Sequence, residues 1–162
     1  MERRTFIAGA ALATTLPIAV KADPVDEARA LAERFASTLT AHDMDAFAAL
    51  FGDDYTNHQV SAAAPAPPAT VSPKQGSVGF FKARLAGMPD LKVTVEAVVA
   101  SADKVAASFV YEGTHGGTYL GVPATGRKLR FTSCDIFRIK DGKLVEHWGM
   151  GDIAGQLAQL KG

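Results

Sequence analysis

The chain has 162 residues, 48% of them hydrophobic, and its 17 basic side chains balance 17 acidic ones. This length and apolar content suit a single domain with one core. The balanced charge provides no basic surface for nucleic acid or for an anionic membrane, so we expect neither as a partner.

Residues 1–22 have the composition of an export signal. Arg3 and Arg4 precede a moderately apolar run, and the segment resembles a twin-arginine leader. The run is interrupted and shorter than the about 20 residues of a spanning helix, so we expect cleavage, a periplasmic or extracellular location and no stable membrane insertion after processing. An ordinary secretory signal and a retained membrane anchor are the alternatives. Residues 23–162 then form the domain, and Cys134, the only cysteine, leaves it no internal disulfide.

Apolar residues at helical spacing predict three helices before any strand. They cover residues 24–39, 44–51 and 74–88, and Asp43 is placed to cap the second. Residues 61–73 contain four prolines and five alanines without periodicity, which predicts a pliable loop. We interpret this loop as a candidate lid or rim of a pocket.

Beyond Asp90 the apolar period changes from about 3.6 to about 2, which indicates a sheet. Each strand keeps its apolar residues at one parity, and Asp141-Gly142 predicts a tight hairpin turn before the last strand. The predicted strands are residues 91–99, 105–115, 129–139 and 143–150, followed by a helix at 153–160. Helices followed by an antiparallel meander predict an α+β domain in which helices pack on one face of a curved sheet and leave a pocket.

Asp135 is the most informative position of the third predicted strand. Strict alternation puts its carboxylate on the same face as Phe131 and Phe137, where a charge is costly. A carboxyl group in an apolar pocket suits proton transfer, so Asp135 is a candidate general acid or base. The alternative is a structural role, in which Asp135 pairs with an arginine or accepts backbone hydrogen bonds at the sheet rim.

His58, His115 and His147 are three of the four histidines and are candidates for the same pocket. Alternation places His115 on the face of Phe109 and Tyr111. Hydrogen-bonded structural roles are the alternative for each histidine. Three histidines and an aspartate are also the ligands of a metal site, but no pair has the short spacing of a metal motif, so we predict no metal.

Several segments together carry a resemblance to a known family. These are Gly113-Thr114-His115-Gly116-Gly117, then Gly121 to Arg127, Asp135 to Arg138 and Asp141 to Trp148, with Phe51 to Tyr55 earlier in the chain. The pattern resembles the SnoaL-like ester cyclases, which are polyketide cyclases of the nuclear transport factor 2-like superfamily. The resemblance implies a cone-shaped α+β fold whose N-terminal helices pack on the concave face of a curved antiparallel sheet.

The resemblance also implies a function. Characterised polyketide cyclases perform a cofactor-free intramolecular aldol condensation, and the family's acid/base aspartate matches Asp135. His115 and His147 match pocket histidines that orient the substrate or stabilise an enolate, so we predict Asp135, His115 and His147 as catalytic. The predicted substrate-binding residues are Tyr55, His58, Phe109, Tyr111, Phe131, Phe137 and Trp148.

We therefore expect a cyclase-like lyase or isomerase that acts, without a cofactor, on a small apolar carbonyl compound. The resemblance further implies a homodimer formed through the sheet face of Cys134 and Ile136. An exported ligand-binding protein without turnover is the alternative, and hydrolysis of a small ester or lactone is another. The export leader departs from the family's cytoplasmic chemistry, which affects the substrate more than the fold.

Overall fold

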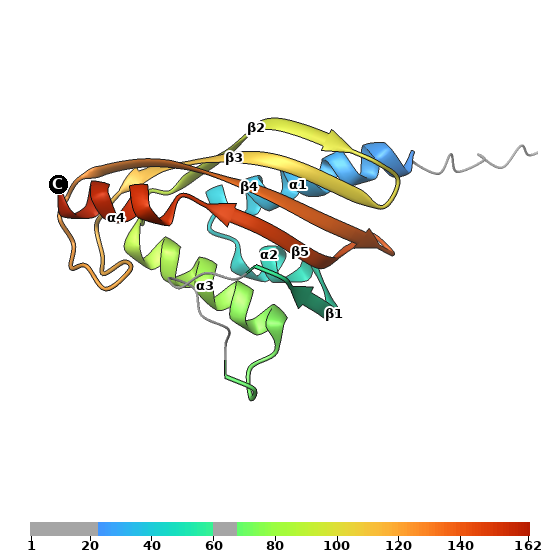
Figure 1. The fold of residues 1–162 in the computed structure, drawn as a ribbon, viewed down its shortest axis with the longest axis horizontal. Helices are drawn as coiled ribbons and strands as arrows, with labels where there is room; N and C mark the ends of the chain where they lie inside the picture. The colour runs from blue at the N-terminus through green and yellow to red at the C-terminus, as the bar shows by residue number, and fades with distance from the viewer. Residues whose placement is uncertain (1–22, 60–67) are drawn as a thin grey trace, which may run out of the picture.

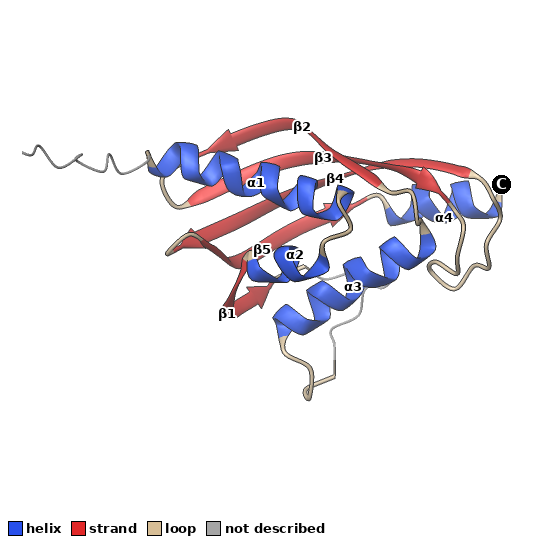
Figure 2. Cartoon of the chain, turned by 180° about the vertical axis from the view of Figure 1, so that it is seen from behind, coloured by secondary structure: helices blue, strands red, loops and turns tan. Residues whose placement is uncertain are grey.

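The structure is a computed structural model that describes residues 23–59 and 68–162, so the predicted leader and residues 61–67 of the predicted loop lie outside the described residues. Five strands form one curved sheet in the order β1-β5-β4-β3-β2. The helices α1, α2 and α3 lie on one face of this sheet (Figures 1 and 2). The elements are α1 (Pro24–Thr40), α2 (Met44–Ala49), β1 (Phe51–Asn57), α3 (Pro73–Gly87), β2 (Lys92–Ala100), β3 (Lys104–Thr114), β4 (Lys128–Lys140), β5 (Lys143–Gly151) and α4 (Ile153–Lys161).

The predicted helices are confirmed, and their first turns explain where they begin. The Asp23 side chain accepts the backbone N–H of Val25, and Pro24 occupies the first turn of α1. Ser72 and Gln75 form a reciprocal capping box at the start of α3. The apolar face of α1 is buried together with inward side chains of the sheet, which forms the core between the two layers. No helix of the described part of the chain is both long and apolar enough to cross a membrane.

The sequence prediction missed β1, and the sheet is consequently not purely antiparallel. The second helix ends at Ala49, and β1 runs parallel to β5 with Asn57 beside His147. Only Phe51 and Tyr55 are buried in β1, four residues apart, so a period of two cannot be seen in its sequence. The remaining pairs are antiparallel as predicted. The parallel pairing matters because it brings Asn57 to the side chains of β5.

A bulge in β2 overturns the predicted parity of residues 91–99. The register with β3 shifts between Val95 and Ala97, and the inward and outward faces exchange beyond that point. Val93 is buried, whereas Val99 is 72% exposed. The predicted turn at Asp141-Gly142 is confirmed, and both residues have the positive φ angles of a tight hairpin.

Candidate functional site

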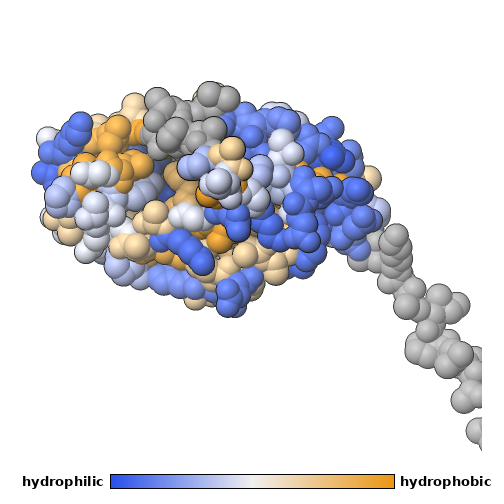
Figure 3. Space-filling model, turned by 90° about the horizontal axis from the view of Figure 1, so that it is seen from below, coloured by the Kyte–Doolittle hydropathy of each residue, from blue (hydrophilic) through white to orange (hydrophobic). Residues whose placement is uncertain are grey.

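A cavity of about 650 Å³ lies between α3 and the inner face of the sheet. Hydrophobic surface is visible in the middle of the molecule when it is seen from below (Figure 3). The large side chains of the cavity wall are aromatic, and they are Phe35, Phe51, Tyr55, Phe80, Phe81, Tyr111 and Phe137. The polar side chains in the wall, apart from the two tyrosines, are Asn57, Gln59, Ser77, Arg84, Ser133, Asp135 and His147. Such a site suits an apolar ligand body with a few placed polar groups.

Asp135 and His147 form a buried pair in this cavity. Their side chains come from the neighbouring strands β4 and β5, and His147 Nε2 lies 2.7 Å from Asp135 Oδ1. Asp135 is 7% exposed and His147 is 8% exposed. The ring of Phe137 stacks on the imidazole at 4.8 Å, which excludes water from one side of the pair. A charged pair at this depth is favourable only if its remaining polar atoms are also bonded.

Gly149 provides the space that the pair occupies. In the β4–β5 register Gly149 stands directly opposite Asp135, and a Cβ atom there would collide with the Asp135 carboxylate and the His147 imidazole. The imidazole can therefore reach diagonally across to β4 only because residue 149 has no side chain. Sequence reasoning missed this residue, although a glycine two positions after a strand histidine was a visible signal.

Asn57 determines which nitrogen of His147 carries a proton. The Asn57 Oδ1 atom accepts the backbone N–H of Gln59 at 2.9 Å, so an oxygen must stand at this place. His147 Nδ1 lies 3.1 Å from the same oxygen and is therefore assigned as an N–H donor. With Nδ1–H bound to Asn57, a single proton lies between His147 Nε2 and Asp135 Oδ1. Without that proton two lone pairs would face each other.

The second carboxylate oxygen of Asp135 is bonded to the hydroxyl of Ser133. Ser133 Oγ donates to Asp135 Oδ2 at 2.5 Å and lies 3.4 Å from the Tyr111 hydroxyl. Burial raises the pKa of Tyr55 to about 12, and burial also raises the pKa of Tyr111, with the negative charge of Asp135 adding to both shifts. Both phenols therefore stay protonated at neutral pH and can donate a hydrogen bond.

Arg84 is the charged residue that sequence reasoning missed in this cavity. It lies on α3 and is only 4% exposed. Its Nε atom donates to the Tyr119 hydroxyl at 3.1 Å. The signal was present, because Ser77, Phe81 and Arg84 follow one another at helical spacing and therefore share the inner face of α3. The apolar residues around Arg84 directed attention to the hydrophobic face of the helix, and the arginine on that face was not recognised.

The structure brings together only part of the predicted site. Asp135, His147, Tyr55, Tyr111 and Phe137 all line the cavity. His115 is completely buried in the connection after β3, where its Nδ1 atom contacts the Thr125 hydroxyl at 2.8 Å. It does not line the cavity, so we assign it no catalytic role.

Phe109 and Phe131 belong to the core and do not line the cavity. Phe131 stacks on Tyr111 at 5.1 Å, so it supports a cavity residue from behind.

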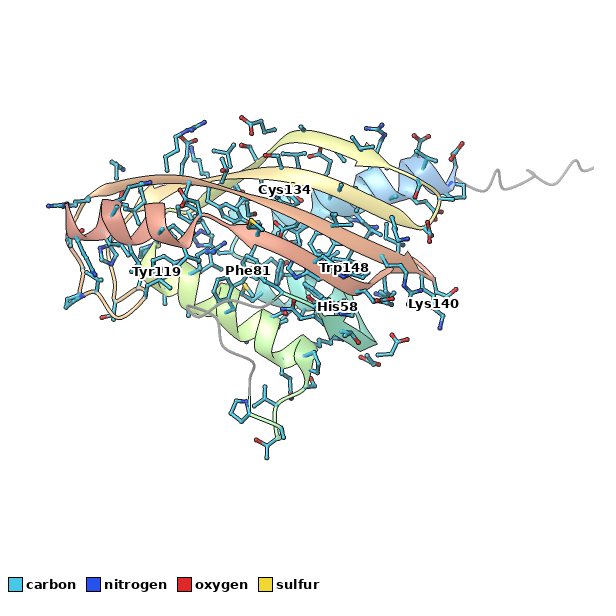
Figure 4. The ribbon with its side chains drawn as sticks, in the orientation of Figure 1. His58, Phe81, Tyr119, Cys134, Lys140 and Trp148 are labelled. Carbon is cyan, nitrogen blue, oxygen red and sulfur yellow. The ribbon has the colours of Figure 1, made fainter. Side chains whose placement is uncertain are left out.

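His58 and Trp148 lie away from the cavity, in contrast to their predicted role in substrate binding. Their rings stack at 4.6 Å, and His58 Nε2 lies 2.8 Å from Glu146 Oε2 (Figure 4). Hydrogen bonds from His58 and Arg138 lower the pKa of Glu146. Alternation explains this position, since Glu146 and Trp148 flank the inward-facing His147 on β5.

The described side chains offer limited means to hold a metal ion. Within residues 23–59 and 68–162, no three His, Cys, Asp or Glu side chains are grouped closely enough to bind one. The polar groups of the cavity instead form two sets, one around Asp135 and one around Arg84. The first set can move a proton and the second can attract an anion.

Comparison with known proteins agrees with this architecture. Residues 29–160 match the family model of the SnoaL-like polyketide cyclases. A curated relative, the aklanonic acid methyl ester cyclase DnrD of Streptomyces peucetius, is 38% identical over 56 residues. That stretch covers 35% of this chain and only 39% of the relative.

Solved structures match over a much larger part of the chain. IdmH of Streptomyces antibioticus, provisionally assigned as a polyketide cyclase, is 31% identical with a TM-score of 0.70, covering 87% of this chain and 100% of IdmH. AclR of Streptomyces galilaeus, provisionally assigned as a hydroxylase, is 25% identical with a TM-score of 0.71, covering 85% of this chain and 97% of AclR. The same fold therefore accompanies different assigned reactions.

Proposed function

This chain belongs to the SnoaL-like polyketide cyclase family, and from that premise we propose that it performs acid/base chemistry without a cofactor on a small carbonyl compound with a largely apolar body. The reaction is an intramolecular aldol-type cyclisation or a related isomerase or lyase reaction. One observation carries the proposal: His147 Nε2 lies 2.7 Å from Asp135 Oδ1 in a buried pair that lines a cavity with aromatic side chains. A carboxylate in such surroundings is suited to remove an acidic C–H proton.

The first step uses the form of the pair in which His147 is an imidazolium and Asp135 a carboxylate. Asp135 takes a proton from the carbon between two carbonyl groups, and the electrons of that C–H bond form an enolate. His147 stays protonated on both nitrogens, bonded to Asn57 and Asp135. The imidazolium therefore orients the base and stabilises its charge before the transfer.

Protonated phenols can stabilise the enolate oxygen. The Tyr55 hydroxyl accepts a hydrogen bond from Ser77 Oγ at 3.3 Å, which leaves its own O–H for a ligand. Its raised pKa keeps that proton in place. A preorganised donor in a water-poor cavity lowers the barrier to forming the enolate.

The ring closes when the enolate carbon attacks a second carbonyl carbon of the same molecule. A new C–C bond forms and the attacked oxygen becomes an alkoxide, which takes back the proton from Asp135. The pair returns to its starting state, so no outside proton or electron is consumed. An aromatic wall favours this step because it holds the chain of the substrate folded.

The name of the curated relative supports the reaction class. DnrD is named as the cyclase of aklanonic acid methyl ester, which is a carbonyl compound. Because the matched stretch is 39% of that relative, its substrate is not transferred to this chain. The proposal rests on the local chemistry of the cavity.

Proton abstraction can be tested before the natural substrate is identified. Methyl benzoylacetate carries an acidic C–H between a ketone and an ester, and NMR in D2O follows its exchange for deuterium. We expect the protein to accelerate this exchange above the buffer rate. Asp135→Asn should reduce the protein-dependent rate about a hundredfold or more, because an amide cannot accept the proton.

His58→Ala is the matched control, because it removes a histidine that lies away from the cavity. It should leave the exchange rate within about twofold of the wild type, the range expected for a distant surface change. If the wild-type protein binds methyl benzoylacetate in a titration but does not accelerate exchange, the enzymatic proposal is wrong. The ligand-binding alternative would then be favoured.

A further inference from the structure

We propose that Arg84 binds a carboxylate of the ligand, and that the natural substrate is therefore a carbonyl compound carrying a carboxylate about one aromatic ring away from its reacting carbon. This inference deepens the proposed function, on which it partly rests, because both sets of groups act on one ligand. It replaces the purely apolar ligand expected from the sequence with an anionic one.

Arg84 carries a positive charge that has no counterion among the described residues. The Arg84 residue is only 4% exposed, and none of the ion pairs within 4 Å among the described residues involves it. Residues 60–67 contain no acidic residue, so that part of the chain cannot supply one either. The nearby Asp135 is paired with His147. A buried charge without a counterion is costly, and proteins keep one where a ligand completes the pair.

Most of the hydrogen-bond donors of Arg84 have no described acceptor. An arginine has five N–H donors, and only the Nε donor of Arg84 has a described partner. That partner is fixed, because the Tyr119 hydroxyl donates its own proton to Gln156 Oε1 at 2.8 Å and can only accept from Arg84. The four N–H groups on the two terminal nitrogens remain available. Two parallel N–H groups are the arrangement that binds a carboxylate bidentately.

Aromatic rings surround the guanidinium of Arg84. Its carbon lies 4.7 Å from the ring centre of Phe80, 5.1 Å from that of Phe81 and 4.6 Å from that of Tyr111. These faces attract the cation and fix its plane, but they provide no hydrogen-bond acceptor in that plane. Arg84 is thus rigid and still lacks an anion. Phe81 and Tyr119, which flank it, are labelled in Figure 4.

Tyr111 defines the distance between Arg84 and the reactive pair. Arg84 lies over its ring, whereas its hydroxyl lies near Ser133, which donates to Asp135. Arg84 therefore lies over the face of the Tyr111 ring, and Asp135 lies beyond the hydroxyl of the same side chain. We accordingly expect a ligand with a planar six-membered ring to reach Arg84 with its carboxylate and Asp135 with its acidic C–H.

Three matched probes test this inference. They are para-acetoacetylbenzoate, its methyl ester and benzoylacetone, which share one aryl diketone and differ only in the far substituent. Isothermal titration calorimetry should show the carboxylate binding about tenfold or more tighter than the methyl ester, the effect of a charge-assisted hydrogen bond. Equal affinities of the wild-type protein for the acid and the ester would overturn the proposal without any variant.

Variants of Arg84 test whether this residue causes the preference for the acid over the ester. Arg84→Met keeps an unbranched apolar side chain and should abolish the acid-over-ester preference, while the ester affinity stays within about threefold of the wild type. Arg84→Lys keeps the positive charge but lacks the two parallel N–H groups of the guanidinium, and should retain an intermediate preference. Arg130→Met removes an exposed arginine on β4 and should change nothing. If Arg84→Met kept the preference, the carboxylate would bind elsewhere and the inference would fail.

The experiment separates this inference from the proposed function. Asp135→Asn should lose deuterium exchange but keep the preference for the carboxylate probe. A wild-type protein that prefers the carboxylate without catalysing exchange would contradict the acid/base function alone. A protein that catalyses exchange of all three probes with equal affinity would contradict the role of Arg84 alone.

Discussion

The two ends of the cavity differ in how completely their polar groups are bonded. At one end Asp135, His147, Asn57 and Ser133 bond to one another, and a single proton lies between the acid and the base. At the other end Arg84 is held by aromatic faces and one hydroxyl, and four of its N–H groups have no described partner. A closed network can transfer a proton with little rearrangement, whereas an open one is completed by a ligand. Reaction and recognition are therefore assigned to different ends.

The largest expected effect separates rate from affinity. With para-acetoacetylbenzoate as the probe, Asp135→Asn should lower the maximal exchange rate about a hundredfold to ten-thousandfold and change the half-saturating concentration little. Arg84→Met should mainly raise the half-saturating concentration. NMR exchange rates measured over a range of probe concentrations, up to saturation of the protein, provide both numbers. Equal loss of rate in the two variants would mean that the ends do not have separate roles.

The next effect tests the space beside the pair. Gly149→Ala places a methyl group against Asp135 and His147, so one of these side chains must move. We expect a loss of about 1–3 kcal/mol in the free energy of unfolding, as for other overpacked sites, together with a lower exchange rate. Urea denaturation measures the first quantity. Gly79→Ala on α3, where a Cβ meets nothing within 4 Å, is the control and should not destabilise the protein.

A loss of stability of the same size, but a smaller effect on function, is expected when the support of Arg84 is removed. Tyr119→Phe takes away the acceptor of Arg84 Nε and a donor to Gln156. Leaving buried polar atoms without partners should cost about 1–3 kcal/mol of stability. The acid-over-ester preference should weaken without disappearing, because the aromatic faces still hold the guanidinium. An unchanged preference measured by calorimetry would show that the aromatic faces alone position it.

The smallest effect concerns Tyr55. It changes the stability of the protein only in alkali and not at neutral pH. Its pKa is raised by burial to about 12, above the value of about 10 in the unfolded chain. The folded state then binds the proton more tightly, so this contribution to stability is complete below pH 10 and is lost as the pH rises through 12. Tyr55→Phe should flatten the fall in stability between these values. The titration of Tyr55 is obtained from the difference in ultraviolet absorbance between the wild type and Tyr55→Phe. A midpoint near the ordinary value of about 10 would contradict the burial of this hydroxyl.

The sequence was sufficient for the helices, the later strands and the inward position of Asp135, because each follows from a regular apolar period. It was insufficient for β1, whose only buried side chains are four residues apart, and for the β2 bulge, which reverses parity without a change in composition. Both failures concern pairing between strands, which is a long-range property.

The candidate site was likewise predicted only in part from the sequence. The histidines were only candidates for one pocket, and alternation within single strands could not show that His147 pairs with Asp135 or that His115 is buried in the connection after β3. The family pattern drew attention to histidines and aromatics, and so did not reveal Arg84 on α3. Arg84 occurs at the same helical spacing as the inward-facing residues of α3. That spacing predicts that its charged side chain also faces inward, which is unusual for an arginine.

The opposite directions of His147 and Trp148 determine what intrinsic fluorescence can report. Trp148 is the only tryptophan, 37% exposed, and it stacks on His58 on the side of the sheet away from the cavity. Its emission will respond to events on that outer surface, such as association of two chains or a change in the His58 ring. A ligand in the cavity will alter it little, so emission from this indole provides an internal reference against which a tryptophan introduced at Phe80 can signal occupancy.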